Sequence, residues 1–217
     1  MTDSPLLDII HPDVRQYILS LGMETDPHII KLATYAKEHA VPRIDIDAGN
    51  VLELLTRMIG ARRVYEFGSA FGFSTYFLAR AVGPQGEVHG SEPNEELITM
   101  HQELFGSHPY RERMTIHQGD GLEILAGLEG SFDVIFIDMD KPGYPDALRA
   151  SVERVRPGGL VIADNVLWSG RTAVAPEPSD ANTEALREFN RMAHADARLR
   201  TAILPVSDGL SVSFRVS

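Results

Sequence analysis

Five strand–helix units follow one another between residues 61 and 195, and this alternation constrains the fold more than any other feature of the sequence. Each unit begins with a short apolar run and continues into a stretch whose apolar residues have helical spacing. The predicted strands are Arg63–Phe67, Gly86–Gly90, Met114–His117, Phe132–Ile137 and Leu160–Ala163. Because such alternation is typical of a parallel sheet covered by helices, we predict a doubly wound α/β fold.

The two ends of the chain depart from this pattern. Two strands, Leu199–Leu204 and Leu210–Arg215, flank the turn Ser207-Asp-Gly209, which favours an antiparallel hairpin and therefore one reversed strand. Residues 1–60 instead have helical spacing, most clearly over Pro27–Ala40 and Asp47–Ile59. We predict one domain, 1–217, with an N-terminal helical cap (1–60) and a sheet core (61–217).

Composition limits the classes of function. The chain has 31 acidic and 20 basic residues, a formal net charge of −11, which disfavours a nucleic-acid-binding surface. It has no cysteine, so disulfides, thiolate metal sites and a cysteine nucleophile are excluded. No apolar run approaches the ~18 residues that span a bilayer, and no export signal begins the sequence. We expect a cytoplasmic protein with small-molecule partners and neither nucleic acid nor membrane partners.

Charged side chains concentrate where the fourth predicted strand ends. Asp138, Asp140 and Lys141 follow its apolar run directly, and buried charges are costly unless they are paired. Asp164 and Asn165 end the next strand, so a parallel sheet would place them beside Asp138 at the edge where ligands bind. Three oxygen donors suit Mg²⁺, Mn²⁺ or Ca²⁺.

Each of these side chains also has a structural interpretation. Asp164-Asn165 could form a simple turn, Asp138 could cap a helix, and Lys141 could be a solvated surface charge. A lysine beside a dication can instead serve as a general base, and the neighbouring carboxylates favour that role for Lys141. Asp140 has no assigned role.

The turn after the first predicted strand contains Glu66, Gly68 and Gly72. A dinucleotide fingerprint starting at Gly68 would need glycine at positions 70 and 73, where this chain has Ala70 and Phe73. The turn therefore suits a nucleoside ligand without phosphates better than a dinucleotide, and a plain tight turn is the alternative.

Glu92 closes the second predicted strand, 92 − 72 = 20 residues after Gly72. An acidic residue there can accept hydrogen bonds from ribose hydroxyls of either an adenosyl or a dinucleotide ligand, and an N-cap is the alternative. The eight histidines have no metal-binding spacing and are interpreted as structural or surface groups. Trp168, the only tryptophan, either walls a substrate pocket or packs in the interior.

Four segments together resemble the cation-dependent O-methyltransferases, the caffeoyl-CoA and catechol O-methyltransferase-like enzymes that use S-adenosylmethionine. They are Val64–Thr75, Phe132–Lys141, Pro157–Trp168 and Leu204–Leu210, and the resemblance extends from about residue 26 to the end. It implies a Rossmann-like methyltransferase sheet, mostly parallel with one antiparallel C-terminal strand, preceded by extra N-terminal helices. Departures from the usual motifs occur at Phe67, Ala70, Phe71, Asp120 and Met139.

Carried over position by position, the resemblance implies metal ligands at Asp138, Asp164 and Asn165 and a catalytic base at Lys141. The implied cofactor contacts are the Ile44 backbone, Glu66, Gly68, Ser69, Ser74, Glu92, Gly121 and Asp138.

The resemblance implies an S-adenosylmethionine- and divalent-metal-dependent O-methyltransferase that methylates a hydroxyl of a catechol-like small molecule. Magnesium is the expected metal, with Mn²⁺ or Ca²⁺ as alternatives, and a homodimer is the expected assembly. The N-terminal helices are expected to cover the site or form the dimer interface, and the segment 168–182 to shape the acceptor pocket. The alternative functions are an NAD-dependent oxidoreductase, which the missing glycines disfavour, and a non-catalytic adenosyl-binding paralogue, which the retained Asp138, Lys141, Asp164 and Asn165 disfavour.

Overall fold

The computed structural model describes residues 9–21, 26–174 and 179–217. Its strands are β1 (Arg63–Phe67), β2 (Glu87–Glu92), β3 (Met114–Gln118), β4 (Phe132–Ile137), β5 (Val155–Ala163), β6 (Leu199–Leu204) and β7 (Leu210–Arg215). Its α-helices are α1 (Pro12–Leu21), α2 (Pro27–Glu38), α3 (Ile46–Met58), α4 (Phe73–Ala81), α5 (Glu95–Phe105), α6 (Gly121–Gly127), α7 (Tyr144–Arg154), α8 (Arg171–Val174) and α9 (Ala181–Ala195).

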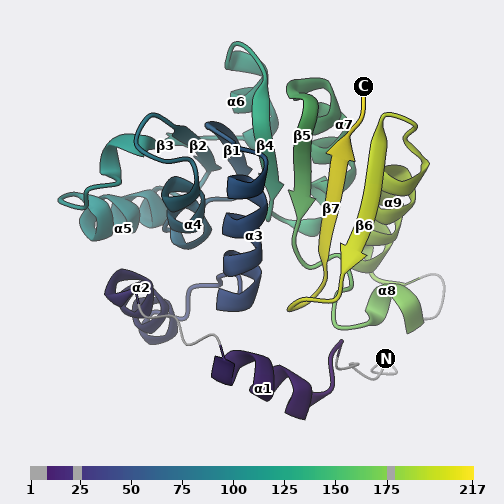
Figure 1. The fold of residues 1–217 in the computed structure, drawn as a ribbon, viewed down its shortest axis with the longest axis horizontal. Helices are drawn as coiled ribbons and strands as arrows, with labels where there is room; N and C mark the ends of the chain where they lie inside the picture. Colours follow the sequence, from purple (N-terminus) through teal and green to yellow (C-terminus); the bar gives the residue numbers. More distant parts are fainter. Residues whose placement is uncertain (1–8, 22–25, 175–178) are drawn as a thin grey trace.

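These strands form one seven-stranded sheet in the order β3-β2-β1-β4-β5-β7-β6. All neighbouring pairs from β3 to β5 are parallel, whereas β7 is antiparallel to both β5 and β6 (Figure 1). The predicted α/β fold with one reversed C-terminal strand is confirmed. Because the chain order reverses between β1 and β4, the carboxyl ends of these two strands are where a doubly wound sheet opens a crevice.

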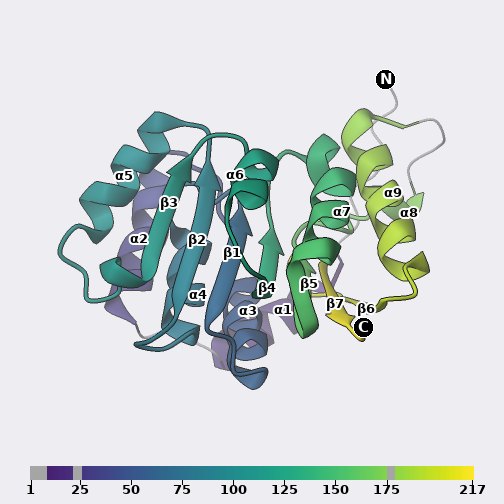
Figure 2. The same cartoon turned by 90° about the horizontal axis from the view of Figure 1, so that it is seen from above.

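Two apolar layers cover the faces of the sheet. Helices α2, α3, α4 and α5 pack on one face and α6, α7 and α9 on the other (Figures 1 and 2). Successive strand residues enter opposite layers, so in β1 Val64 belongs to the same apolar cluster as Leu52 of α3, while Tyr65 belongs to the cluster of Leu148 of α7. The predicted N-terminal helices therefore share a core with the sheet from α2 onward.

Local signals set most element boundaries. Asp26 caps α2, because its side chain accepts a hydrogen bond from the His28 amide. The predicted bounds of β1, β4, β6 and β7 are confirmed. The predicted start of the fifth strand is wrong: β5 begins at Val155, and the residues 156–159, expected to end a helix, lie in the strand across an irregular register with β4.

The segment 168–182, expected to shape the acceptor pocket, contains the short helix α8, and its residues 175–178 lie outside the described part of the chain. None of the helices in the described segments is long and apolar enough to cross a membrane.

Candidate functional site

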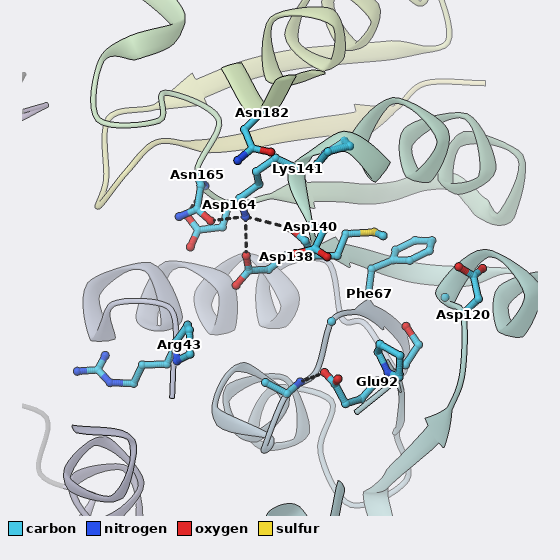
Figure 3. Close-up of a pocket in the computed structure, with 18 of the residues that line it drawn as sticks. Arg43, Phe67, Glu92, Asp120, Asp138, Asp140, Lys141, Asp164, Asn165 and Asn182 are labelled. Atoms are coloured by element: carbon cyan, nitrogen blue, oxygen red, sulfur yellow. Dashed lines mark hydrogen bonds and ion pairs between the residues drawn. The ribbon is translucent and has the colours of Figure 1, made fainter. Parts of the chain in front are cut away.

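A cavity of about 960 Å³ opens at the carboxyl ends of β1, β2, β4 and β5 (Figure 3). Its charged lining consists of five carboxylates and two cations: Glu92, Asp120, Asp138, Asp140, Asp164, Arg43 and Lys141. Of the predicted site residues, Gly68, Glu92, Gly121, Asp138, Lys141, Asp164 and Asn165 line this one cavity. The excess of negative charge favours a ligand with a positive centre.

The turn that contains Gly68 packs closely against the end of β4 at one side of the cavity. Gly68 has φ +78°, and a Cβ atom at this position would clash with the carbonyl oxygen of Asp138. The amide of Asp138 in turn donates to the carbonyl of Phe67 at 3.1 Å. Glycine is therefore required at position 68 both for the left-handed backbone and for the close approach of the two strand ends.

Glu92 faces the cavity from the end of β2 and is only 6% exposed. Its carboxylate accepts hydrogen bonds from the amides of Ala70 at 3.0 Å and Asn94 at 2.8 Å. The N-cap of α5 is Asn94, so the N-cap interpretation of Glu92 is wrong. Burial raises the pKa of Glu92, and the charge of Asp140 raises it further. Each carboxylate oxygen has a second lone pair with which it can bind a hydroxyl group.

Glu66 lies beneath the glycine turn and is fully buried. Burial raises its pKa to about 7, and the charges of Asp138 and Glu92 add to this effect. The Thr75 hydroxyl donates to one of its oxygens at 2.5 Å. Four predicted cofactor contacts stand behind the cavity wall rather than in its lining, and their role stays a prediction: Ile44, Glu66, Ser69 and Ser74.

Lys141 lies at the centre of the other end of the cavity (Figure 3). Its Nζ donates hydrogen bonds to Asn165 Oδ1 at 2.7 Å, Tyr144 Oη at 2.9 Å, Met139 O at 3.1 Å and Asp138 Oδ1 at 3.2 Å. The lysine side chain is 11% exposed, so the interpretation of Lys141 as a solvated surface charge is wrong. The sheet therefore brings the ends of β4 and β5 together around one amine, as the sequence predicted.

Asp138 and Asp164 form a pair of carboxylates, of which Asp164 is buried and Asp138 has a side chain that is 23% exposed. Asp164 is 1% exposed, and burial together with the charge of Asp138 raises its pKa to about 7. Burial also raises the pKa of Asp138, an effect that the ammonium of Lys141 partly offsets. Asn165 has φ +59°, a left-handed conformation that asparagine tolerates. Two like charges in a poorly hydrated site are stabilised by a cation placed between them.

The donor set fits a hard divalent cation. The described residues contain no group of three or more His, Cys, Asp or Glu side chains that could bind a metal, so such a site needs the amide oxygen of Asn165 as a third donor. Carboxylate and amide oxygens are the donors that Mg²⁺, Mn²⁺ and Ca²⁺ prefer. The Lys141 ammonium already bonds to two of the three donor residues, Asp138 and Asn165, which indicates that this point attracts positive charge.

The sequence analysis missed several residues of the site. Tyr144 contacts Lys141 and could have been noticed from its spacing, three residues further along the chain. Asp208 accepts hydrogen bonds from the amides of Ser169 and, through its own carbonyl, Leu167, and so fixes the loop that contains Trp168. Asp120, noted only as an extra charge, caps α6. Arg43 and Asn182 line the cavity from distant segments, and no local motif marks them.

The chain is similar in sequence and fold to known O-methyltransferases. Residues 24–216 match the family model described as O-methyltransferase. The chain is 30% identical over 181 residues to caffeoyl-CoA O-methyltransferase 1 of Eucalyptus globulus, covering 79% of this chain and 74% of that protein. It is 28% identical over 201 residues to the catechol O-methyltransferase of Niastella koreensis, covering 90% of each. The crystal structure of the O-methyltransferase TomG from Streptomyces achromogenes, in complex with SAM, is similar with a TM-score of 0.84 and 26% identity, covering 94% of this chain and 96% of that one.

Proposed function

Since this chain belongs to the O-methyltransferase family, we propose that it transfers a methyl group from S-adenosylmethionine to one hydroxyl of a catechol-like small molecule with the help of a divalent cation. Family membership agrees with the predicted enzyme class and disfavours both the NAD-dependent oxidoreductase and the non-catalytic paralogue. Magnesium is the proposed metal because all three candidate donors are hard oxygens.

One observation carries the proposal. One end of the cavity, lined by Gly68, Glu92 and Gly121, suits a nucleoside ligand. At the opposite end, Lys141 bonds to both Asp138 and Asn165. A methyl donor bound at the first end would face an acceptor bound at the second. Holding two reactants in one orientation supplies a large part of the acceleration in transfer reactions.

The end that suits a nucleoside would recognise its ligand through shape and hydrogen bonds. Glu92 would accept hydrogen bonds from the ribose hydroxyls, and the ligand would lie beside the Gly68 backbone, which lines this end of the cavity. S-adenosylmethionine supplies a methyl group on a positively charged sulfur. The carboxylates of Asp138 and Asp140 would favour this positive charge over the neutral product left after transfer.

The end of the cavity that contains Lys141 would activate the acceptor hydroxyl for attack on the methyl group. A divalent cation held by Asp138, Asp164 and Asn165 would supply the Lewis acidity that makes a coordinated hydroxyl a stronger acid. In its neutral amine form, Lys141 would take the hydroxyl proton at Nζ, an atom that lies within hydrogen-bonding distance of Asp138 and Asn165. The Trp168 ring, 5.8 Å from Nζ, would form a flat wall for an aromatic acceptor.

Methyl transfer to catechol, followed by mass spectrometry of the product, tests the proposal. We expect a product 14 Da heavier than catechol, formed with S-adenosylmethionine, lost on treatment with EDTA and restored by Mg²⁺. Replacing the cofactor with NAD should give no reaction. Product formation unaffected by EDTA would contradict the metal requirement, and no methylation of any vicinal diol would contradict the acceptor class.

We also propose that the protein is a homodimer. The α1 helix exposes Val14, Tyr17, Ile18 and Leu21, whose spacing places them on one face of the helix. An exposed apolar stripe of this kind suits an interface between two copies. Light scattering coupled to size exclusion should give twice the 23.9 kDa chain mass, and a monomer at micromolar concentration would contradict this proposal.

A further inference from the structure

Tyr144 lies fully buried at the first position of α7, directly behind the acceptor end of the cavity. Its ring packs edge-on against Phe189 of α9, with the ring centres 5.5 Å apart. Its hydroxyl oxygen lies 2.9 Å from Lys141 Nζ and 3.0 Å from the carbonyl oxygen of Asp164. The tyrosine therefore joins the two strand ends that form the site, although it does not line the cavity.

The direction of these hydrogen bonds is set by chemistry. An ammonium group can only donate, so the Tyr144 oxygen accepts from Lys141. The single hydroxyl proton is then free to be donated to the carbonyl of Asp164. A phenol is a neutral hydroxyl near pH 7, so Tyr144 carries this proton.

Lys141 has more acceptors than protons. Its three N–H bonds face four oxygens, of which Asp138 Oδ1 and Asn165 Oδ1 belong to the candidate metal ligands. A dication bound by these two oxygens would repel the ammonium and compete for the same lone pairs. The other two acceptors, Tyr144 Oη and Met139 O, are neutral groups outside the candidate ligand set.

We propose that Tyr144 is a positioning residue for Lys141: its hydroxyl and the Met139 carbonyl form a seat that keeps Nζ beside the acceptor when a divalent cation takes Asp138 and Asn165. This inference rests on the proposed metal-dependent function. When the metal binds, Lys141 would lose its hydrogen bonds to Asp138 and Asn165 and keep those to Tyr144 and Met139. Because the seat is made of neutral groups, it holds the amine whether or not the amine carries a proton.

The substitution Tyr144→Phe removes only the hydroxyl. Tyr76→Phe is the matched control, because its hydroxyl also donates to a partly buried acceptor, Asp26, and neither residue lines the cavity. We expect Tyr144→Phe to lower kcat roughly 10- to 100-fold, the loss typical of one hydrogen bond to a charged group. The KM for the acceptor should change by less than about 3-fold, and Tyr76→Phe should keep kcat within about 2-fold.

Metal binding gives a readout that does not depend on activity. Quenching of the single tryptophan, Trp168, by Mn²⁺ measures cation affinity close to Lys141. Tyr144→Phe should leave this affinity within about 3-fold of the wild type, because its hydroxyl is not a ligand. Lys141→Ala should tighten Mn²⁺ binding about 10-fold, since the competing ammonium is gone.

A double-mutant cycle separates a seat for Lys141 from a general structural role. On the Lys141→Ala background, adding Tyr144→Phe should change kcat by less than about 2-fold, because there is no amine left to position. Multiplicative losses in kcat would overturn the inference. A parallel fall in Mn²⁺ affinity and melting temperature for Tyr144→Phe would also overturn it, since the hydroxyl would then support the backbone of Asp164.

The possible failures are distinguishable. A wild-type protein that neither binds Mn²⁺ nor methylates a catechol contradicts the proposed function. A wild-type protein that does both, with Tyr144→Phe unchanged in kcat, contradicts the seat alone. If Tyr144→Phe does not fold, the Lys141→Ala titration decides, and an unchanged or weaker Mn²⁺ affinity overturns the inference.

Discussion

The two ends of the cavity are built from different interactions. At the β1–β2 end, backbone amides hold the carboxylate of Glu92, and the glycine at position 68 brings the turn against β4. At the β4–β5 end, the carboxylates of Asp138 and Asp164 lie close enough to interact electrostatically, and the ammonium of Lys141 bonds to Asp138. The β1–β2 end is thus held by main-chain interactions, whereas the β4–β5 end depends on attraction between two carboxylates and one ammonium group.

This difference predicts different sensitivities. The hydrogen bonds from the backbone amides to Glu92 involve no metal ion, so the β1–β2 end should keep its ligand affinity when metal is removed. A charge-balanced site should respond strongly to any change in the number or position of cations. The following substitutions test this contrast.

The largest effect should come from Asp164→Asn. Removing one carboxylate of the pair would remove a proposed charged metal ligand, and turnover should fall roughly 1,000-fold or more, since bound metals supply several kcal/mol of transition-state stabilisation. Mn²⁺ affinity should fall in parallel, whereas the melting temperature should not fall, because a buried carboxylate with a raised pKa is costly. Steady-state rates and thermal melts measure both effects. Asp146→Asn, at an exposed position on α7, is the control and should change turnover by less than about 2-fold.

Lys141→Ala should have the next largest effect. Loss of a general base typically lowers kcat roughly 100- to 10,000-fold, and affinity for S-adenosylmethionine should be unchanged because Lys141 belongs to the other end of the cavity. Rate measurements and calorimetry on the same protein test the two statements. A near wild-type kcat would remove Lys141 from the mechanism.

Gly68→Ala tests the β1–β2 end. The added Cβ would clash with the Asp138 carbonyl at a left-handed backbone position, and we expect a loss of unfolding free energy of about 1–3 kcal/mol together with weaker S-adenosylmethionine binding. Gly60→Ala separates strain from contact, because Gly60 also has a positive φ but no atom within 4 Å of the added Cβ. Equal losses in urea unfolding for both variants would show that the contact with β4 contributes nothing.

The smallest effect should be a pH dependence from Glu66. Its pKa is about 7 in the folded protein and near 4.5 in the unfolded chain, so the folded state binds more protons between these values. The unfolding free energy should therefore decrease as pH rises from 4.5 to 7, by up to roughly 3 kcal/mol, and level off above pH 7. Glu66→Gln should flatten this slope in urea titrations, whereas Glu95→Gln, exposed on α5, should leave it intact. An unchanged slope in Glu66→Gln would contradict the assignment.

The parts of the fold that depend on local patterns could be predicted from the sequence. Strands β1 and β4 are short stretches rich in apolar residues, and their predicted bounds agree with the structure. The first residues of β5 could not be predicted, because Arg156-Pro-Gly-Gly159 has the composition of a turn. An ion pair between Arg156 and Asp133 of β4 connects that segment to the neighbouring strand, and such a long-range contact leaves no local signal.

The candidate site shows the same limit. Asp138, Asp164 and Asn165 could be predicted because parallel strand ends must be neighbours, and the structure places them together. The roles of Tyr144 and Asp208 depend on where a side chain points after packing, and Arg43 and Asn182 reach the cavity from segments that no motif connects. Glu66 and Ser74 illustrate the reverse case, since the motif marks them but the structure places them behind the cavity wall.

The most direct test of the contrast between the two ends measures S-adenosylmethionine affinity and catechol methylation on one sample, before and after EDTA and again after Mg²⁺ is restored. We predict that the affinity stays within roughly 3-fold throughout, while methylation is lost with EDTA and returns with Mg²⁺. Methylation that survives complete chelation, or cofactor affinity that collapses together with turnover, would contradict the account.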